Sequence, residues 1–204
     1  MMPYIFKRED DYNNIIDRVS KETNVPAYLI KAFVAVESGF NKNAVRKEPH
    51  RNDASYGLIQ ILKKTAENYG FKGSEKDLQD PYTNLKYGAY FIKTLMNSYS
   101  NLKDVIASYN AGFPRKANNT TNIIKSIYGE PKPDWIYANQ PYVDKVFAYT
   151  MYFMAKQNND FKKAYDIRSM ILSKNYDKIS GNINYLLIAG VLAFIVGLVF
   201  LRRQ

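Results

Sequence analysis

The sequence contains no cysteine and only one histidine among its 204 residues. The absence of cysteine excludes disulfide bonds and thiolate metal ligands. The histidine, His50, follows Pro49 in a polar stretch, and no group of histidines and carboxylates has the spacing of a metal site. We therefore expect neither a catalytic metal nor another cofactor, so that any chemistry falls to carboxyl, hydroxyl and amide groups.

Negative charge is also scarce. The chain has 29 Lys and Arg residues against 19 Asp and Glu, which gives a formal net charge of +10. A basic surface favours an anionic partner such as nucleic acid, anionic lipid or the bacterial cell wall. The basic residues are scattered, and no basic helix or aromatic RNA-binding signature is present. We therefore expect no nucleic-acid partner.

A carboxyl group at the end of an apolar helix is the first candidate for chemistry. The pattern predicts a helix that Pro26 opens and Glu37 ends, with Gly39 just past its last turn. Glu37 emerges at the edge of the apolar stripe, at the negative end of the helix dipole. Both surroundings raise the pKa of a carboxyl group, which suits a general acid. The alternative is an ordinary solvated glutamate.

Five short motifs contain this glutamate and follow one another in order. They are Glu37-Ser38-Gly39-Phe40, Ser55-Tyr56-Gly57-Leu58-Ile59-Gln60, Asn84-Leu85 with Gly88, Ser108-Tyr109-Asn110-Ala111-Gly112, and Tyr142-Val143 with Val146 and Tyr149. Each motif alone is a weak signal. Their order and spacing, over roughly residues 12–155, resemble the lytic transglycosylase family with the lysozyme-like fold, the relatives of goose-type lysozyme.

The resemblance implies a mainly α-helical domain with a glycan cleft. It implies cleavage of the β-1,4 bond between N-acetylmuramic acid and N-acetylglucosamine in peptidoglycan, with Glu37 as the single catalytic acid and base. The substrate-binding residues that it implies are Ser38, Ser55, Gln60, Tyr109, Asn110, Tyr142 and Tyr149. Tyrosine and amide side chains supply the flat apolar faces and paired polar groups that sugars require.

The family usually works with one carboxyl group, which protonates the leaving oxygen and then deprotonates the muramyl 6-hydroxyl to give a 1,6-anhydro product. A second carboxylate that held a water molecule would make the enzyme a hydrolytic muramidase instead. Asp53, in the polar loop before Gly57, is the candidate for that role. Asp80 precedes Pro81 and fits a helix N-cap better.

Two features depart from the family pattern. The loop over residues 41–54 is longer and more basic than the usual spacer. Asn139 also stands where the family often has a glutamate, three residues before Tyr142. These differences put in doubt which polar groups contact the glycan on that side, but they leave the role expected for Glu37 unchanged.

Helical periodicity covers most of the chain. Besides the Glu37 helix, it predicts helices over 11–21, 80–99, 102–111, 141–156 and 160–173, a short helix that ends at Gly70, and one near 121–128. No strand is convincing, although the 41–60 region has room for a small hairpin.

The C-terminal part has a different character. Residues 185–201 form an uncharged apolar run that approaches the roughly 20 residues of a membrane span, and Arg202 and Arg203 follow it. We expect a lysozyme-like domain over 1–174, a linker over 175–184 and a transmembrane helix over 185–201. Ala189, Ala193 and Gly197 form a small-residue stripe that could pack against another helix.

These expectations suggest a single-pass, tail-anchored protein. The N-terminus lacks the long apolar core of a signal peptide, which fits the membrane of a bacterial virus and a role in genome entry through the wall. A bacterial envelope enzyme is the rival location. A wall-binding membrane protein that kept the fold without activity is the third hypothesis for function.

Overall fold

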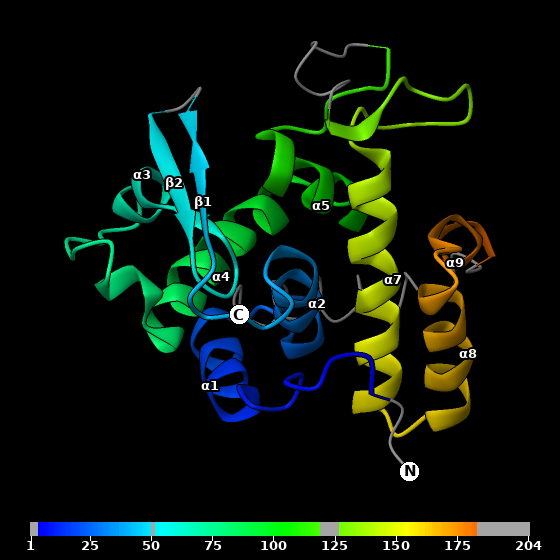
Figure 1. Ribbon diagram of the computed structural model, residues 1–204, viewed down its shortest axis with the longest axis horizontal. Coiled ribbons are helices and arrows are strands. Elements are labelled where there is room, and N and C mark those ends of the chain that lie inside the picture. Colours follow the sequence, from blue (N-terminus) through cyan, green and yellow to red (C-terminus); the bar gives the residue numbers. More distant parts are fainter. Residues whose placement is uncertain (1–3, 50–51, 119–126, 183–204) are drawn as a thin grey trace, which may run out of the picture.

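The computed structural model describes residues 4–49, 52–118 and 127–182 (Figure 1). In chain order, the elements are α1 (Asn13–Thr23), α2 (Ala27–Glu37), β1 (Val45–Glu48), β2 (Asp53–Tyr56), β3 (Ile61–Leu62), α3 (Lys63–Glu67), the 3-10 turn η2 (Asp77–Gln79), α4 (Pro81–Ser98), α5 (Leu102–Ala111), α7 (Gln140–Gln157), α8 (Phe161–Leu172) and α9 (Tyr176–Asn182). The predicted mainly α-helical fold is confirmed. The helix predicted near 121–128 lies mostly outside the described residues.

Helix α2 lies at the centre of the fold (Figure 1). It packs against α1 and α7, while α4 packs on α1 and α5 packs on both α4 and α7. Its side chains are apolar on nearly every face, and Leu29, Ile30 and Phe33 are buried. A helix that is apolar all round is stable only when other elements enclose it. Glu37 is the last residue of this enclosed helix, so the packing of the core fixes the position of its carboxyl group.

Local signals in the sequence fix where several helices begin. The Asp80 side chain accepts a hydrogen bond from the Thr83 backbone N–H at 2.9 Å, directly before Pro81. Asn101 caps α5 in the same way through the Lys103 N–H, also at 2.9 Å. Each cap satisfies a backbone donor that the first helical turn leaves unpaired. The predicted N-cap role of Asp80 is therefore confirmed.

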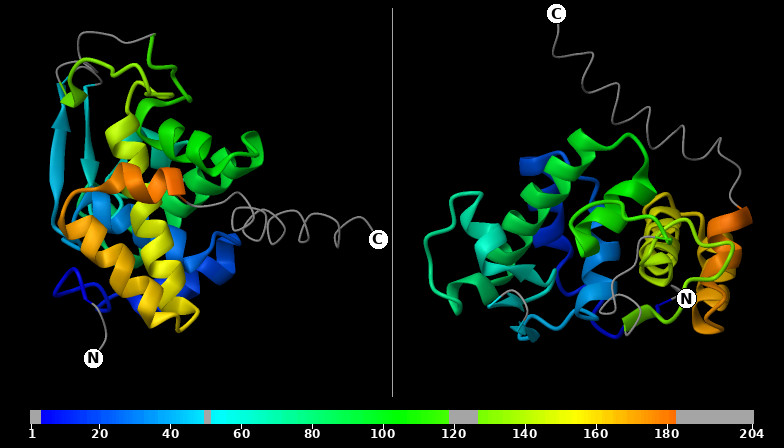
Figure 2. Two further views of the ribbon diagram at one scale, coloured as in Figure 1. Left: turned by 90° about the vertical axis from the view of Figure 1, so that its right-hand side faces the viewer. Right: turned by 90° about the horizontal axis from the view of Figure 1, so that it is seen from above.

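The region expected to have room for a hairpin forms a small antiparallel sheet in the order β1-β2-β3. Arg46 lies opposite Ser55, and Glu48 lies opposite Asp53. The sheet lies at one end of the molecule and α8 and α9 at the other, as Figures 1 and 2 both show. Because side chains alternate between the faces of a strand, Arg46 and Glu48 share one face of β1.

The turn after β2 is held by a buried amide from α4. Asn84 Nδ2 donates to the carbonyl oxygens of Tyr56 at 2.7 Å and Leu78 at 2.9 Å, and Asn84 Oδ1 accepts from the Ile59 N–H at 2.9 Å. Gly57 has φ +73°, and a Cβ there would lie 2.5 Å from the Asn84 side chain. Glycine is therefore required at this turn for both conformation and space.

The N-terminal segment is bound to α7 by a buried carboxylate. Glu9 is fully buried and accepts hydrogen bonds from the backbone N–H groups of Ile5 and Phe6, from the Tyr152 hydroxyl at 3.0 Å and from Lys156 Nζ at 2.5 Å. These donors meet the condition under which a charge can be buried, since each carboxylate oxygen is paired. Residues 4–11 therefore pack as part of the domain.

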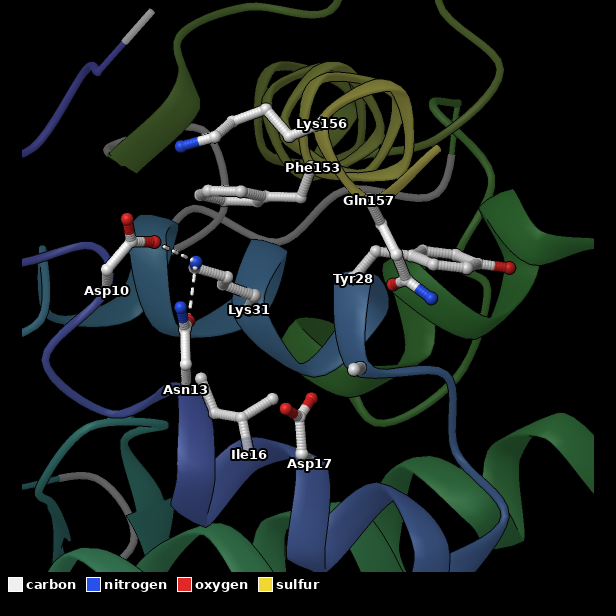
Figure 3. A pocket seen from close by; sticks show the side chains of 10 residues that line it. Asp10, Asn13, Ile16, Asp17, Tyr28, Lys31, Phe153, Lys156 and Gln157 are labelled. Carbon is white, nitrogen blue, oxygen red and sulfur yellow. Dashed lines mark hydrogen bonds and ion pairs between the residues drawn. The ribbon is translucent and has the colours of Figure 1, made fainter. Parts of the chain in front are cut away.

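A hollow of about 420 Å³ lies between this segment, α1, α2 and the end of α7 (Figure 3). Lys31, one of its lining residues, donates through Nζ to Asp10 Oδ1 at 2.7 Å and to Asn13 Oδ1 at 2.8 Å. Its other lysine, Lys156, is paired with Glu9. Both lysines thus form ion pairs with carboxylates of the protein itself. These polar contacts connect the four segments that surround the hollow.

The chain beyond α8 is more ordered than the sequence suggested. Residues 176–182, inside the predicted linker, form α9, which packs against α7 and α8, and Ile179 is buried. The predicted transmembrane helix over 185–201 lies outside the described residues. Within the described part of the chain, no helix combines the length and the apolar character of a membrane span. The division into domain, linker and span stays a prediction.

The Asn84 amide gives a test of this scaffold. Asn84→Ala leaves three buried backbone groups without partners, at about 1–3 kcal/mol each, so we expect a loss of at least about 3 kcal/mol in the free energy of unfolding. Urea denaturation measures it. Asn14→Ala, at an exposed position on α1, is the control and should change stability by less than about 0.5 kcal/mol. A loss below about 1 kcal/mol for Asn84→Ala would contradict this account.

Candidate active site

The Glu37 carboxyl group meets a tyrosine hydroxyl from the far end of the chain. Glu37 is half-buried at the C-terminus of α2, and the Tyr142 hydroxyl on α7 donates to its Oε1 at 2.5 Å. The two residues come together because α2 and α7 pack side by side. Glu37 therefore does not project into bulk solvent, as an ordinary helix-terminal glutamate would.

Burial is the main influence on this carboxyl group. Removal from water raises the pKa of Glu37 from 4.5 to about 7, even though the Tyr142 hydrogen bond and the positive charge of Arg46 act to lower it. Burial disfavours the charged form, while a donor or a cation favours it. The balance leaves Glu37 about half protonated at neutral pH, which is the range in which a carboxyl group can both give and take a proton.

A second tyrosine, Tyr109, is held in a fixed position near this carboxyl group. Its ring packs between Phe33 and Phe91, at centroid distances of 4.5 and 5.1 Å, and its hydroxyl donates to the Ile59 carbonyl at 2.8 Å. Burial, followed by the negative charge of Glu37, raises the pKa of Tyr109 well above 10. Tyr109 is therefore neutral, fixed, and close enough to Glu37 to sense its charge.

A narrow groove runs beside Tyr109. Its lining residues are Gln60, Ile61, Leu62, Thr65, Phe91, Tyr109, Asn110 and Gly112. It combines aromatic faces with amide groups, the mixture that we expected for a glycan site. Two of the predicted substrate-binding residues besides Tyr109, Gln60 and Asn110, thus lie along one surface.

Three of the predicted residues, Gln60 among them, use their polar atoms inside the protein. Gln60 Nε2 donates to the carbonyls of Ala44 and Gly57, and its Oε1 accepts from the Ser55 hydroxyl at 3.1 Å. The Ser38 hydroxyl donates to the Leu58 carbonyl at 2.7 Å. These bonds tie the end of α2 to the turn after β2. Through them, Ser38, Ser55 and Gln60 shape the wall of the site.

Tyr149 is not brought to this carboxyl group. It lies about two turns beyond Tyr142 on α7, where its ring packs on Phe6 at 5.6 Å and on Phe153 at 6.3 Å. Its hydroxyl interacts with Tyr176 at the start of α9. Because they are about two helical turns apart, both tyrosines lie on nearly the same face of α7, but only Tyr142 is level with the end of α2.

Two charged residues near Glu37 were missed by sequence reasoning. Arg46 and Glu48, on β1, pair at 2.7 Å, and both act on the pKa of Glu37. Their spacing was a signal that a strand would place both on one face. Asp53, the expected second carboxylate, instead accepts from the backbone N–H groups of Ala54 at 2.8 Å and Lys64 at 3.1 Å. Both of its oxygens thus bond to backbone N–H groups, one in β2 and one at the start of α3.

No cluster of His, Cys, Asp and Glu within residues 4–49, 52–118 and 127–182 has the geometry of a metal site. The polar groups around Glu37 are a phenol, amides and one ion pair. Such a set suits proton transfer and binding of a neutral polar ligand.

Comparison with known proteins defines the class. The Transglycosylase SLT domain family matches residues 14–126, and the chain belongs to this family. Protein IpgF of Shigella flexneri is 29% identical over 116 residues, which cover 55% of this chain and 75% of that protein. The predicted family, and with it the predicted enzyme class of lytic transglycosylases, are confirmed.

Two further relatives are named as membrane-bound lytic murein transglycosylases. Transglycosylase C of Photorhabdus laumondii is 32% identical over 124 residues, which cover 53% of this chain and 33% of that protein. Transglycosylase E of Buchnera aphidicola is 33% identical over 121 residues, which cover 55% of each. The chain thus spans a third to about half of these two relatives.

The fold has a counterpart among solved structures. The X-ray structure of an inactive mutant of the lytic transglycosylase Slt from Pseudomonas aeruginosa aligns with a TM-score of 0.56 at 22% identity. The alignment covers 73% of this chain and 25% of that one. At this identity the likeness establishes the fold, and it agrees with the predicted lysozyme-like architecture.

The raised pKa of Glu37 predicts how stability depends on pH. The folded state holds the proton up to about pH 7, and the unfolded chain releases it near pH 4.5, so the wild type loses stability between these values. Glu37→Gln cannot ionise. We expect its free energy of unfolding to gain about 3 kcal/mol relative to the wild type between pH 4 and pH 8.

Urea denaturation at a series of pH values measures this difference. Glu67→Gln, on the exposed side of α3, is the matched control and should keep a constant offset from the wild type. An offset for Glu37→Gln that also stays constant across this range would show that the carboxyl group is not buried as described.

Proposed function

We propose that this protein cleaves the β-1,4 bond between N-acetylmuramic acid and N-acetylglucosamine in peptidoglycan, with Glu37 as both acid and base. The observation that carries the proposal is a half-buried carboxyl group with a pKa of about 7, bonded to Tyr142 and close to Tyr109. Membership in the transglycosylase family and relatives named as murein transglycosylases support the substrate.

The first step needs a proton on Oε2 of Glu37, the carboxyl oxygen that does not bond to Tyr142. The Tyr142 hydroxyl donates to Oε1, so Oε1 acts as an acceptor and Oε2 is the oxygen that can carry the acidic hydrogen. Glu37 passes this proton to the glycosidic oxygen as the bond from that oxygen to the muramyl C1 breaks. Proton transfer in the transition state is what a general acid contributes.

The second step regenerates the acid. The Glu37 carboxylate removes the proton from the muramyl 6-hydroxyl while that oxygen bonds to C1. The product carries a 1,6-anhydro ring, the leaving sugar keeps the first proton, and no water is consumed. Because the nucleophile belongs to the substrate, its attack is intramolecular and needs no second carboxylate to position water.

The Tyr142 bond also favours this exchange of roles. It lowers the pKa of Glu37 against the rise that burial causes. A carboxyl group with a much higher pKa would give up its proton reluctantly, and one near 4.5 would be ionised before the substrate arrived. Burial and the tyrosine together hold it between these limits.

A hydrolytic muramidase is the alternative for the same substrate. It needs a second carboxylate that holds a water molecule near C1. Glu48 is the candidate, because it lies close enough to Glu37 to raise the pKa of that carboxyl group, and it pairs with Arg46 at 2.7 Å. Asp53 is less suited, since backbone N–H groups occupy both of its oxygens.

Digestion of purified peptidoglycan, followed by mass spectrometry of the fragments, tests the proposal. We expect anhydro ends from the wild type and a rate at least about a hundredfold lower for Glu37→Gln, which keeps the shape and removes the acid. Glu67→Gln should retain the wild-type rate. Activity of Glu37→Gln within a few-fold of the wild type would overturn the assignment.

The same experiment separates the alternatives. Reducing ends in place of anhydro ends, together with their loss in Glu48→Gln, would support the muramidase. Binding of the wild type to cell-wall sacculi without release of any fragment would support the non-catalytic wall-binding protein.

We further propose that residues 185–201 anchor the enzyme in a bilayer. The support is the uncharged apolar run in the sequence, followed by Arg202 and Arg203. Such an anchor would hold a basic catalytic domain next to its anionic polymer, in a virion membrane or in a bacterial envelope. Presence in purified virions would support the role in viral genome entry, and absence from them would contradict it.

Flotation of the full chain with vesicles of zwitterionic phosphatidylcholine tests the anchor without help from the net charge of +10. An Ile195→Arg, Val196→Arg variant should float at least about tenfold less, because each arginine at mid-bilayer costs about 2.5–3.5 kcal/mol. Leu172→Arg, at an exposed position on α8, is the control. Equal flotation of all three proteins would exclude the span.

A further inference from the structure

A chain of hydrogen bonds beside the active site starts at a backbone carbonyl. Asn139 precedes α7 and is fully buried. Its Nδ2 donates to the Ala107 carbonyl oxygen at 3.1 Å and to Asn110 Oδ1 at 3.0 Å. A carbonyl oxygen can only accept, so the atom of Asn139 that faces Ala107 must be the nitrogen. That contact fixes the orientation of the Asn139 amide.

The orientation of Asn110 follows from that of Asn139. The atom of Asn110 that meets an N–H donor must be its oxygen, and the Tyr128 hydroxyl donates to the same Oδ1 at 2.9 Å. Two donors fill the two lone pairs of Oδ1. Asn110 Nδ2 has no hydrogen-bond partner within the described part of the chain.

Asn110 belongs to the groove beside Tyr109. It lines that groove with Tyr109 and Gln60, and it is half-buried. Tyr109 and Tyr128 flank it, and the charge of Glu37 raises the pKa of both tyrosines, after the larger effect of burial. Asn110 Nδ2, which lacks a partner among the described residues, therefore lies near the place where a bound sugar would meet Glu37.

We propose that Asn139 and Tyr128 are positioning residues that hold Asn110 as a fixed hydrogen-bond donor to the acetamido carbonyl of the bound glycan. The inference rests on the proposed function. A sugar hydroxyl both donates and accepts and fits either orientation of an amide, but an acetamido carbonyl only accepts and needs a donor. A de-N-acetylated sugar presents an ammonium group there, which has no acceptor to offer Nδ2.

The arrangement has a cost that stability alone does not explain. Asn139 Oδ1 is buried without a hydrogen-bond partner among the described residues. An unpaired buried oxygen is destabilising, because it has given up its hydrogen bonds to water. The amide nitrogen of Asn139 is the part that acts on Asn110, and it comes only with that oxygen attached. A carboxylate at position 139 would have no hydrogen to give either to Ala107 or to Asn110.

The test compares two glycan strands, one fully acetylated and one chemically de-N-acetylated at glucosamine. The measured quantity is the ratio of kcat/KM for the two. We expect the wild type to prefer the acetylated strand at least about tenfold, since a lost hydrogen bond beside an unpaired donor costs about 1.5 kcal/mol or more. Asn110→Ala should lose most of this preference.

Two variants address the positioning residues. Asn139→Asp keeps the shape and replaces the donor by an acceptor, so the Asn110 amide should turn over and the preference should fall to about one or reverse. Tyr128→Phe frees one lone pair of Oδ1 and should reduce the preference several-fold. Tyr82→Phe, which removes a hydroxyl bonded to Glu22 on the surface, is the control and should keep the wild-type ratio.

The ratio distinguishes positioning from a general structural defect. A merely structural role would slow both substrates equally and leave the preference unchanged, which would overturn the inference. So would a wild type that does not discriminate between the strands. If Asn139→Asp does not fold, Tyr128→Phe decides alone. Loss of the proposed function itself would appear separately, as undiminished cleavage by Glu37→Gln.

Discussion

The burial of one carboxyl group is the constraint on which the site depends. Glu37 ends a helix that the core encloses, and its charge is therefore disfavoured by lack of water. The Tyr142 hydroxyl offsets part of that effect and leaves the pKa at about 7. Neither influence alone would suffice, because an exposed glutamate is ionised at neutral pH and a deeply buried one without a donor does not release its proton. Packing of α2 against α7 sets both influences at once.

The amide side chains around this carboxyl group divide into two kinds. Asn84 and Gln60 use their donors and acceptors inside the protein and hold the turn after β2, from which Gln60 lines the groove. Asn139 donates to Asn110 and to a backbone carbonyl, and the Asn110 amide nitrogen at the groove has no partner among the described residues. Rigid amides suit this work, because a fixed donor costs no rotational freedom when a ligand binds. The same residue type thus supports both the scaffold and recognition.

The long basic loop that departs from the family pattern has an evident place in the fold. Part of it forms β1, which presents the Arg46–Glu48 pair near Glu37. The two charges act on the pKa of Glu37 in opposite directions, so their effects on the carboxyl group partly cancel. The fold also accommodates Asn139, the other departure from the family pattern, because its side chain donates a hydrogen bond to Asn110.

The sequence by itself determined the helices, the caps at Asp80 and Asn101, and the place of Glu37 at the end of an apolar helix. These features depend on residues a few positions apart, which interact whatever the rest of the chain does. Only the tertiary structure decided that Tyr142 rather than Tyr149 meets Glu37, that Asp53 is occupied at the start of α3 while Glu48 is close to the carboxyl group, and that residues 176–182 form α9. Those outcomes depend on which helices pack side by side and at what level along their axes. Sequence periodicity identifies which face of a helix is buried, but it does not give the position of the helix along the axis of its neighbour. Contacts between distant segments therefore depend on how the helices pack in the core.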